Sequence, residues 1–176
     1  MIHSRKGHYH SPVSRNERIT PTCRLLVLER SPRFPNAEPG HFVSIRVTEG
    51  ISPLLRRPYS IMDLTADELT LLVKVVGAGS AFLGAKEPGE RVDLIGPLGR
   101  STFPRPGGGS AVLVAGGTGL APLRMAARIW EGIELHLVYG ASCADEILEP
   151  IARDAFSNMH VATLDGSLGY HGDVVA

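Results

Sequence analysis

The segment FPRPGGGS, residues 103–110, divides the sequence into two parts whose apolar residues follow different patterns. Before it, short runs rich in Val, Ile and Leu are separated by turns such as Pro39-Gly40, with little helical pattern between them. After it, nearly continuous apolar runs alternate with helical patterns. Short strands at close spacing favour an antiparallel barrel, whereas buried strands alternating with helices favour a parallel sheet. We therefore predict an all-β barrel over residues 13–103 and an α/β domain over residues 110–176.

The first part contains four runs that we predict as strands, because their apolar residues partly alternate and turn residues bound them. Residues 1–17 are polar and rich in histidine, and we expect them to form a loose leader that enters the first strand. A short helix is expected over residues 79–87, with Ser80 as its cap. The predicted strands span residues 23–29, 41–47, 69–76 and 91–96.

The second part predicts three strands and two helices. The first helix covers residues 122–133, and its apolar residues form one stripe. The second covers residues 142–156, starts with a Ser-x-x-Asp capping pattern and is broken or kinked at Pro150. This order is half of a doubly wound domain, and so thin a sheet implies either a fragment or a partner that covers its open face. The helical stripe consists of Leu123, Ala126, Ala127 and Trp130. The strands span residues 111–117, 134–140 and 160–166.

The charge and the cysteine content argue against several classes of function. Lys and Arg together number 18, as do Asp and Glu, so no overall field attracts nucleic acid or an acidic membrane surface. No run approaches the roughly 20 apolar residues of a membrane-spanning helix, and the polar N-terminus lacks an apolar signal core. The two cysteines, Cys23 and Cys143, are too few for a disulfide framework or a four-ligand metal or iron–sulfur site. We expect a cytoplasmic protein without a metal site.

The stretch LVAGGTGLAPL, residues 113–123, forms a glycine-rich turn between a buried strand and a helix. Glycines at this junction let the backbone approach a ligand closely, and the N–H groups at the helix start attract phosphate. The dinucleotide-binding pattern G-x-G-x-x-G is incomplete, because the third glycine is absent after Gly117-Thr118-Gly119. Pro122 suits the first helical position, where no N–H is needed. The turn either binds a nucleotide or is purely structural.

The stretch RRPYS, residues 56–60, combines a cation, an aromatic ring and a hydroxyl in what we predict as a strand. Arg57 and Tyr59 then share a face, because side chains alternate along a strand. An arginine fork can hold a phosphate, and a tyrosine ring can stack on a flat heterocycle. The alternative is an edge strand with both arginines in solvent. A second glycine turn, KVVGAGS at residues 74–80, is either another anion site or a plain β-turn.

Taken together, these motifs resemble the ferredoxin–NADP reductase superfamily. The resemblance implies a six-stranded antiparallel barrel that holds a flavin, followed by an α/β domain that holds a nicotinamide nucleotide. Within the superfamily, the sequence is most similar to the electron-transfer subunit of dihydroorotate dehydrogenase, over about residues 13–175. The motifs that carry this likeness are PGHF (39–42), PLLRRPYSI (53–61), VVGAGS (75–80), LIGPLGR (94–100), VAGGTGLAPL (114–123) and LDGSLGYHGDV (164–174).

Carried over residue by residue, the resemblance implies two groups of cofactor-binding residues and no catalytic side chain. The flavin, expected to be FAD, would contact the barrel, with Arg57 as its phosphate clamp. The nicotinamide nucleotide, expected to be NAD, would contact the glycine turn of the α/β domain. The flavin residues are Arg57, Pro58, Tyr59, Ser60, Leu72, Val73, Lys74, Gly79 and Ser80. The nucleotide residues are Gly116, Gly117, Thr118, Gly119 and Pro122.

Two further features bear on the cofactors. Asp145 and Glu146 follow the second predicted α/β strand without an adjacent arginine, which favours NADH over NADPH, although Arg153 could reach back. The subunit that the sequence resembles continues into a cysteine cluster that binds a [2Fe–2S] centre, and the present sequence has neither the cysteines nor the segment. We interpret the chain as truncated before that segment, with a flavin-only paralogue as the alternative.

The resemblance also implies a reaction. Hydride would pass between NAD(H) and FAD, and single electrons would then pass through a [2Fe–2S] centre to a separate FMN-bearing subunit that oxidises dihydroorotate to orotate in pyrimidine biosynthesis, within a heterotetramer. Such chemistry needs no general acid or base, so we expect the histidines to be structural or exposed. The alternatives are a stand-alone NAD(P)H flavin reductase, a hydrogenase-type diaphorase subunit, and a cofactor-free regulatory or docking module. The histidines concerned are His41, His136, His160 and His171.

Overall fold

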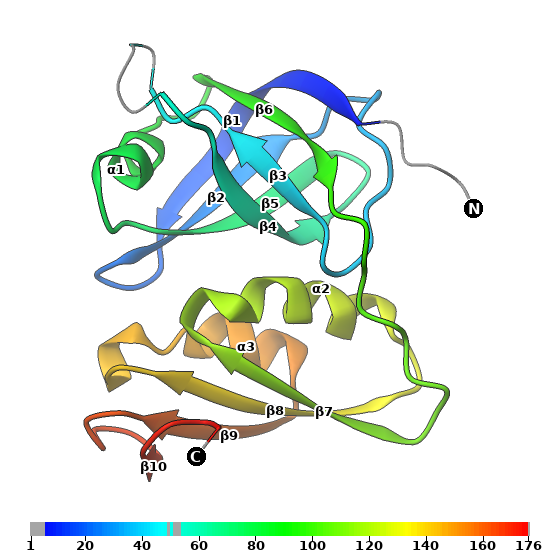
Figure 1. Cartoon of the computed structure of the whole chain (residues 1–176), viewed down its shortest axis with the longest axis vertical. Helices are drawn as coiled ribbons and strands as arrows, with labels where there is room; N and C mark the ends of the chain where they lie inside the picture. Colours follow the sequence, from blue (N-terminus) through cyan, green and yellow to red (C-terminus); the bar gives the residue numbers. More distant parts are fainter. Residues whose placement is uncertain (1–5, 49, 51–53, 176) are drawn as a thin grey trace.

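The computed structural model describes residues 6–48, 50 and 54–175, and its first domain is a closed barrel of six antiparallel strands (Figure 1). The order around the barrel is β1-β2-β5-β4-β3-β6, so the predicted barrel is confirmed. One short helix, α1 (Ala78–Gly84), follows β5. The strands are β1 (Gly7–Arg18), β2 (Cys23–Glu29), β3 (Phe42–Ile45), β4 (Arg57–Leu64), β5 (Glu68–Lys74) and β6 (Arg91–Leu98).

Strands β2 and β5 bury both of their faces, which explains why they are so rich in apolar residues. Leu26 and Leu71, which are opposite each other in the register, belong to the apolar core inside the barrel. Their neighbours Leu25 and Leu72 are also paired, and they pack instead against the second domain. Alternation of side chains along each strand therefore supplies one barrel core and one interdomain surface.

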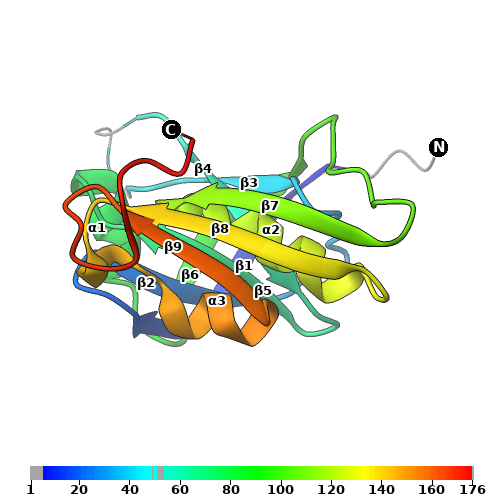
Figure 2. The ribbon, with the colours of Figure 1, turned by 90° about the horizontal axis from the view of Figure 1, so that it is seen from below.

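The second domain is a sheet of four strands in the order β10-β9-β8-β7, all parallel. Two helices, α2 (Leu120–Ile129) and α3 (Glu149–Ala155), lie between this sheet and the barrel (Figure 1). Figure 2 shows the opposite face of the sheet, which no helix of the described residues covers. The expected α/β domain is thus confirmed as a partial one. Its strands are β7 (Ser110–Gly116), β8 (Glu134–Ala141), β9 (Asn158–Thr163) and the additional short β10 (Tyr170–His171).

The two domains share apolar clusters and ion pairs, and this fixes how they sit against each other. Met62 of β4 packs with the cluster of the α/β domain, and Met125 of α2 packs with the cluster of the barrel. Arg124 of α2 also reaches the carboxylate of Asp63 on β4, at 3.3 Å, and Arg128 pairs with the same oxygen. A cleft between the domains therefore has walls that are held in place by both units.

The expectation of a loose leader over residues 1–17 is wrong for the part that the structure describes. Residues Gly7–Arg18 form β1, which pairs with β2 on one side and with β6 on the other. Its residues look like a leader because the outward face is polar and only Ser11 and Val13 are buried. The strand depends on pairing with the next strand, β2, and with the distant β6, and local composition indicates neither. The predicted start of the barrel at residue 13 falls inside β1, while residues 1–5 and Pro53 lie outside the described residues.

Two helices also differ from their predicted form. The single helix over residues 142–156 is instead a short 3-10 turn, η2 (Ala144–Glu146), followed by α3. Ile147 and Leu148 are buried between these elements, and Pro150 stands in the first turn of α3, where a missing N–H costs little. In α1 the N-cap residue is Gly77, and Ser80 caps the helix from its third position.

Candidate functional site

A cleft with a volume of about 460 Å³ lies between the barrel and the α/β domain. The ends of β4 and β5 and the turn before α1 supply most of its lining, and the glycine turn after β7 supplies the rest. Nine residues that the sequence predicts as cofactor-binding line it: Arg57, Pro58, Tyr59, Ser60, Leu72, Lys74, Gly79, Ser80 and Thr118. Three further lining residues, Val76, Gly77 and Ala78, belong to the KVVGAGS turn that the sequence offers as an anion site or a plain β-turn, and Ala121 was not predicted.

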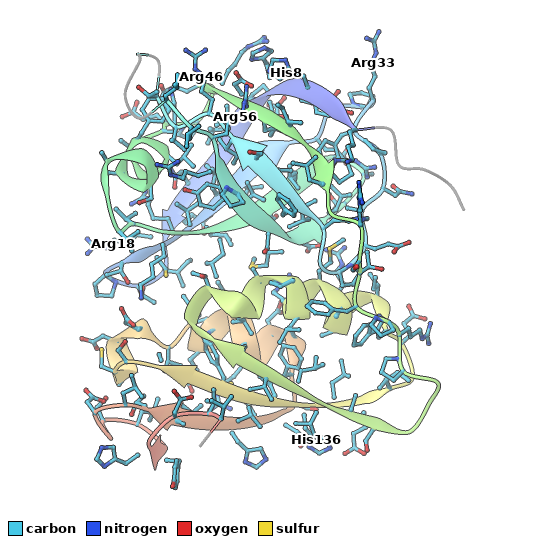
Figure 3. All side chains as sticks on the ribbon, in the orientation of Figure 1. His8, Arg18, Arg33, Arg46, Arg56 and His136 are labelled. Atoms are coloured by element: carbon cyan, nitrogen blue, oxygen red, sulfur yellow. The ribbon has the colours of Figure 1, made fainter. Side chains whose placement is uncertain are left out.

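The two adjacent arginines have different surroundings. Arg56 makes two hydrogen bonds to the carboxylate of Asp93, at 2.8 and 2.9 Å, and its other nitrogen donates to backbone carbonyls. His8 contacts the same carboxylate, and both His8 and Arg56 lie in the half of the barrel remote from the α/β domain (Figure 3). Burial opposes ionisation of Asp93, but the hydrogen bonds from Arg56 and His8 outweigh it and hold its pKa below the ordinary value.

Arg57, in contrast, is exposed and lines the cleft. Its guanidinium donates to the backbone carbonyl oxygens of Leu55 and Arg56, at 3.1 and 3.4 Å. Among the residues that the structure describes, no carboxylate pairs with it. A guanidinium at the edge of a cleft that has no carboxylate partner can bind an incoming anion without first breaking an ion pair.

Tyr59 lines the same cleft as Arg57, two positions further along β4. The ring is half-buried, and this burial raises the pKa of its hydroxyl above the ordinary value. A partly covered aromatic ring with one face on a cleft can stack on a flat heterocycle. Arg57 and Tyr59 thus line the same cleft, together with the intervening Pro58 and with Ser60.

The turn between β5 and α1 is stabilised by the hydroxyl of Ser80. That oxygen accepts hydrogen bonds from the backbone N–H groups of Val76 and Gly77, at 2.9 and 3.1 Å, and donates to the Gly77 carbonyl at 3.0 Å. The side chain of Ser80 thus shapes the turn. Ala78 and Gly79 line the cleft from the first turn of α1, where N–H groups lack partners within the helix.

A second cleft, of about 230 Å³, lies where the carboxyl ends of β7, β8 and β9 meet. Ligands of parallel α/β sheets bind at this edge. Gly117 has a φ of +51°, a left-handed conformation that favours glycine. At Gly140 a Cβ atom would lie 2.5 Å from Val174, so glycine is needed there for the last segment to cross the sheet edge. The lining residues are Lys74, Gly116, Gly117, Gly140, Ala141, Ser142, Glu146, Leu164, Gly172, Asp173 and Val174.

Three predicted residues line neither of these two clefts. The side chain of Val73 is buried in the barrel core, because it points to the opposite side of β5 from its neighbours Leu72 and Lys74. Gly119 lies in the 3-10 turn η1 (Gly117–Gly119). Pro122 is the third residue of α2 and not the first, because the helix already begins at Leu120.

Tyr139 of β8 supports the glycine turn and was not predicted from the sequence. Its ring is fully buried, and its hydroxyl donates to the carbonyl oxygen of Gly117 at 3.1 Å. Burial raises the pKa of this hydroxyl to about 12, so it remains a donor at all ordinary pH values. The sequence shows Tyr139 as one aromatic residue within an apolar strand, and nothing local indicates its partner.

An ion pair joins the two domains beside both clefts. The ammonium group of Lys74 lies 2.8 Å from Oε1 of Glu146, and its hydrogen bond is the main reason that the pKa of Glu146 is lowered. Asp145 is exposed. Arg153 pairs with Glu149 on its own helix, at 2.7 Å, and does not reach back.

The predicted histidines line neither of the two clefts. Nδ1 of His41 accepts a hydrogen bond from the backbone N–H of Glu38, at 2.9 Å. His136 lies at the face of the sheet away from the barrel (Figure 3). Within the described residues, no helix is long and apolar enough to cross a bilayer. The same residues contain no group of three or more His, Cys, Asp or Glu placed to hold a metal ion.

Comparison of the sequence and the structure with known proteins shows what this chain is similar to. No protein-family model matches the sequence. The electron transfer subunit of dihydroorotate dehydrogenase B (NAD(+)) from Bacillus velezensis is 35% identical over 173 residues, which cover 94% of this chain and 67% of the relative. The subunit of the same name from Geobacillus thermodenitrificans is 36% identical, over 90% and 67%. The structure of an NADH-dependent reduced ferredoxin-NADP oxidoreductase has a TM-score of 0.80 and 28% identity, over 94% of this chain and 60% of that one.

A closed antiparallel barrel and a parallel α/β unit with a cleft between them define a reductase fold of the ferredoxin–NADP reductase type. The identity and coverage of the curated relatives are specific enough to go further. The chain belongs to the family of dihydroorotate dehydrogenase B electron-transfer subunits, and it spans about two thirds of the length of those relatives. It is thus related to flavin-dependent electron-transfer oxidoreductases.

Proposed function

We propose that this chain binds FAD in the 460 Å³ cleft and NAD(H) in the cleft at the sheet edge, and that it passes electrons between them. The observation that carries the proposal is the set of groups on one wall of the larger cleft. An uncompensated guanidinium, a half-buried aromatic ring and the turn before α1 come together there. A bound flavin would supply the chemistry, since it accepts a hydride and releases single electrons.

The residues of the larger cleft fit such a cofactor. Arg57 offers charge-assisted hydrogen bonds to a phosphate, and Tyr59 offers a stacking surface beside it. Thr118 and Ala121 close the cleft from the α/β side, next to the glycine turn. In this proposal the chain positions two cofactors and excludes water between them, and no side chain transfers a proton.

The smaller cleft fits a nicotinamide nucleotide without a 2′-phosphate. Gly116 and Gly117 leave room for a close approach of the backbone, and Tyr139 fixes the turn. Lys74, the one cation in the described lining, is paired with Glu146, and Arg153 is engaged with Glu149, so the described residues offer no free cation to an added phosphate. The name of the curated relatives includes NAD(+), which supports the same choice.

We further propose that the chain serves a dihydroorotate dehydrogenase catalytic subunit, as the names of the relatives suggest. Relay through a [2Fe–2S] centre would need four thiolates, whereas this sequence holds two cysteines. Such a centre would therefore belong to a longer form of the protein, and a heterotetramer with an FMN-bearing subunit would be its setting. A stand-alone flavin reductase is the second candidate.

The decisive experiment starts from the purified protein reconstituted with FAD. We expect visible flavin absorbance to remain after gel filtration and to bleach anaerobically with NADH, more slowly with NADPH. Transfer to a dihydroorotate dehydrogenase catalytic subunit, tested against transfer to free flavin, separates the two candidates. Failure to retain either FAD or FMN after reconstitution would refute the flavin proposal and favour a cofactor-free docking module.

A further inference from the structure

Lys74 stands at the junction of the two clefts. Among the described residues, it alone lines both the larger cleft, with Arg57 and Tyr59, and the smaller one, with the glycine turn. It is the last residue of β5 and belongs to the barrel, whereas its partner Glu146 belongs to the α/β domain. The ion pair at 2.8 Å is therefore a charged contact between the two cofactor sites of the proposed function.

Both charges are held by ordered backbone. Lys74 is paired with Cys23 in the register of β5 with β2. Glu146 ends the turn η2, whose first residue, Ala144, donates its N–H to the hydroxyl of Ser167 at 2.8 Å. The turn that carries Glu146 is thus tied to the loop that follows β9. The side chains are 34% and 22% exposed, so solvent screens this pair less than it screens a surface pair.

Glu146 determines how much positive charge the larger cleft presents. Two cationic side chains line that cleft, Arg57 and Lys74. Glu146 compensates the charge of Lys74, while no carboxylate of the described residues pairs with Arg57. Reduction of a flavin ring adds negative charge to it, so a nearby cation favours the reduced form and a nearby carboxylate opposes it.

We propose that Glu146 is a positioning residue that sets the reduction potential of the flavin by compensating Lys74. The inference rests on the proposed function, because it requires a flavin in the larger cleft. With the pair intact, the flavin faces a neutral contact on this side. Loss of the carboxylate leaves the ammonium group uncompensated, and loss of the ammonium group leaves the carboxylate uncompensated. The two losses therefore act in opposite directions.

The experiment measures the midpoint potential of bound flavin by anaerobic titration against a reference dye. We expect Glu146→Gln to shift the two-electron equilibrium about tenfold towards the reduced flavin, a rise of about 30 mV. Lys74→Gln is expected to lower the potential, and the double variant is expected to lie close to the wild type. Glu149→Gln serves as the matched control, because Glu149 pairs with Arg153 on α3 and lines neither cleft.

The outcomes separate this inference from the proposed function. If the wild type retains no flavin, the proposed function fails. If all proteins retain flavin and Glu146→Gln changes the potential no more than Glu149→Gln does, the tuning role is refuted while flavin binding stands. A shift of both single variants in the same direction also contradicts the role, because that result indicates a general disturbance of the cleft. If Lys74→Gln loses flavin, the comparison of Glu146→Gln with Glu149→Gln decides.

Discussion

Replacing Arg57 by Ala tests the exposed cation of the proposed flavin site. A hydrogen bond between a charged group and a phosphate contributes about 1.5–3 kcal/mol. The affinity for FAD should therefore fall by about 10- to 150-fold. The described hydrogen bonds of Arg57 reach only adjacent carbonyl groups, at 3.1 and 3.4 Å, so the free energy of unfolding of the flavin-free protein should change by less than about 0.5 kcal/mol. Fluorescence titration and urea unfolding measure the two quantities.

The neighbouring residue supplies a matched control. Arg56→Ala removes the partly buried partner of Asp93 and should lower the free energy of unfolding by about 1–3 kcal/mol, with little effect on FAD affinity per folded molecule. Loss of Arg57 should thus affect mainly the affinity for FAD, and loss of Arg56 mainly the free energy of unfolding. Equal FAD affinity of wild type and Arg57→Ala, or a stability loss larger than that of Arg56→Ala, would refute the assignment.

Three other substitutions or conditions test the surrounding structure. Asp63→Asn removes the carboxylate shared by the two arginines of α2 and should lower the free energy of unfolding, measured in urea, by about 2–3 kcal/mol. A change below about 0.5 kcal/mol would contradict the interdomain role. Tyr139→Phe should raise the KM for NADH severalfold at unchanged flavin content, since the carbonyl of Gly117 loses its donor; an unchanged KM argues against this support. Because the pKa of Asp93 is lowered in the folded protein, its contribution to stability is present above about pH 4 and is lost as the pH falls through the lower folded value. Asp93→Asn should therefore lose less stability on acidification than the wild type. Parallel curves of unfolding free energy against pH for the two proteins would contradict this.

Local patterns predict the parts of the fold that short-range chemistry determines. Alternation along RRPYS places Arg57 and Tyr59 on one face, and the structure has both on one wall of a cleft. The glycine turn after β7 likewise lies at the edge of a parallel sheet, as the sequence indicates. Their roles as ligands of cofactors remain predictions, since they concern molecules that the chain would bind.

Long-range pairing accounts for what the sequence does not predict. β1 is a strand because β2 and β6 lie on either side of it, and its own polar residues carry no such signal. The different surroundings of Arg56 and Arg57 depend on Asp93, which is 37 positions from Arg56 in the sequence. Lys74 and Glu146 are separated by 72 positions and meet only when the two domains pack. The two ion pairs determine which charges face a cleft, and no local periodicity indicates any of these contacts.

The packing of the domains also limits how the proposed electron transfer can be altered by mutation. Leu72 and Ala121 line the larger cleft and at the same time belong to the apolar cluster that joins the barrel to the α/β domain. Both are almost fully buried, so enlarging either side chain would disturb the interdomain contact as well as the cleft. By contrast, charge changes at the partly exposed positions of the cleft leave that apolar cluster intact. The environment of the proposed cofactors is therefore best altered through Arg57, Lys74 and Glu146, because changes at these positions spare the apolar contact between the domains.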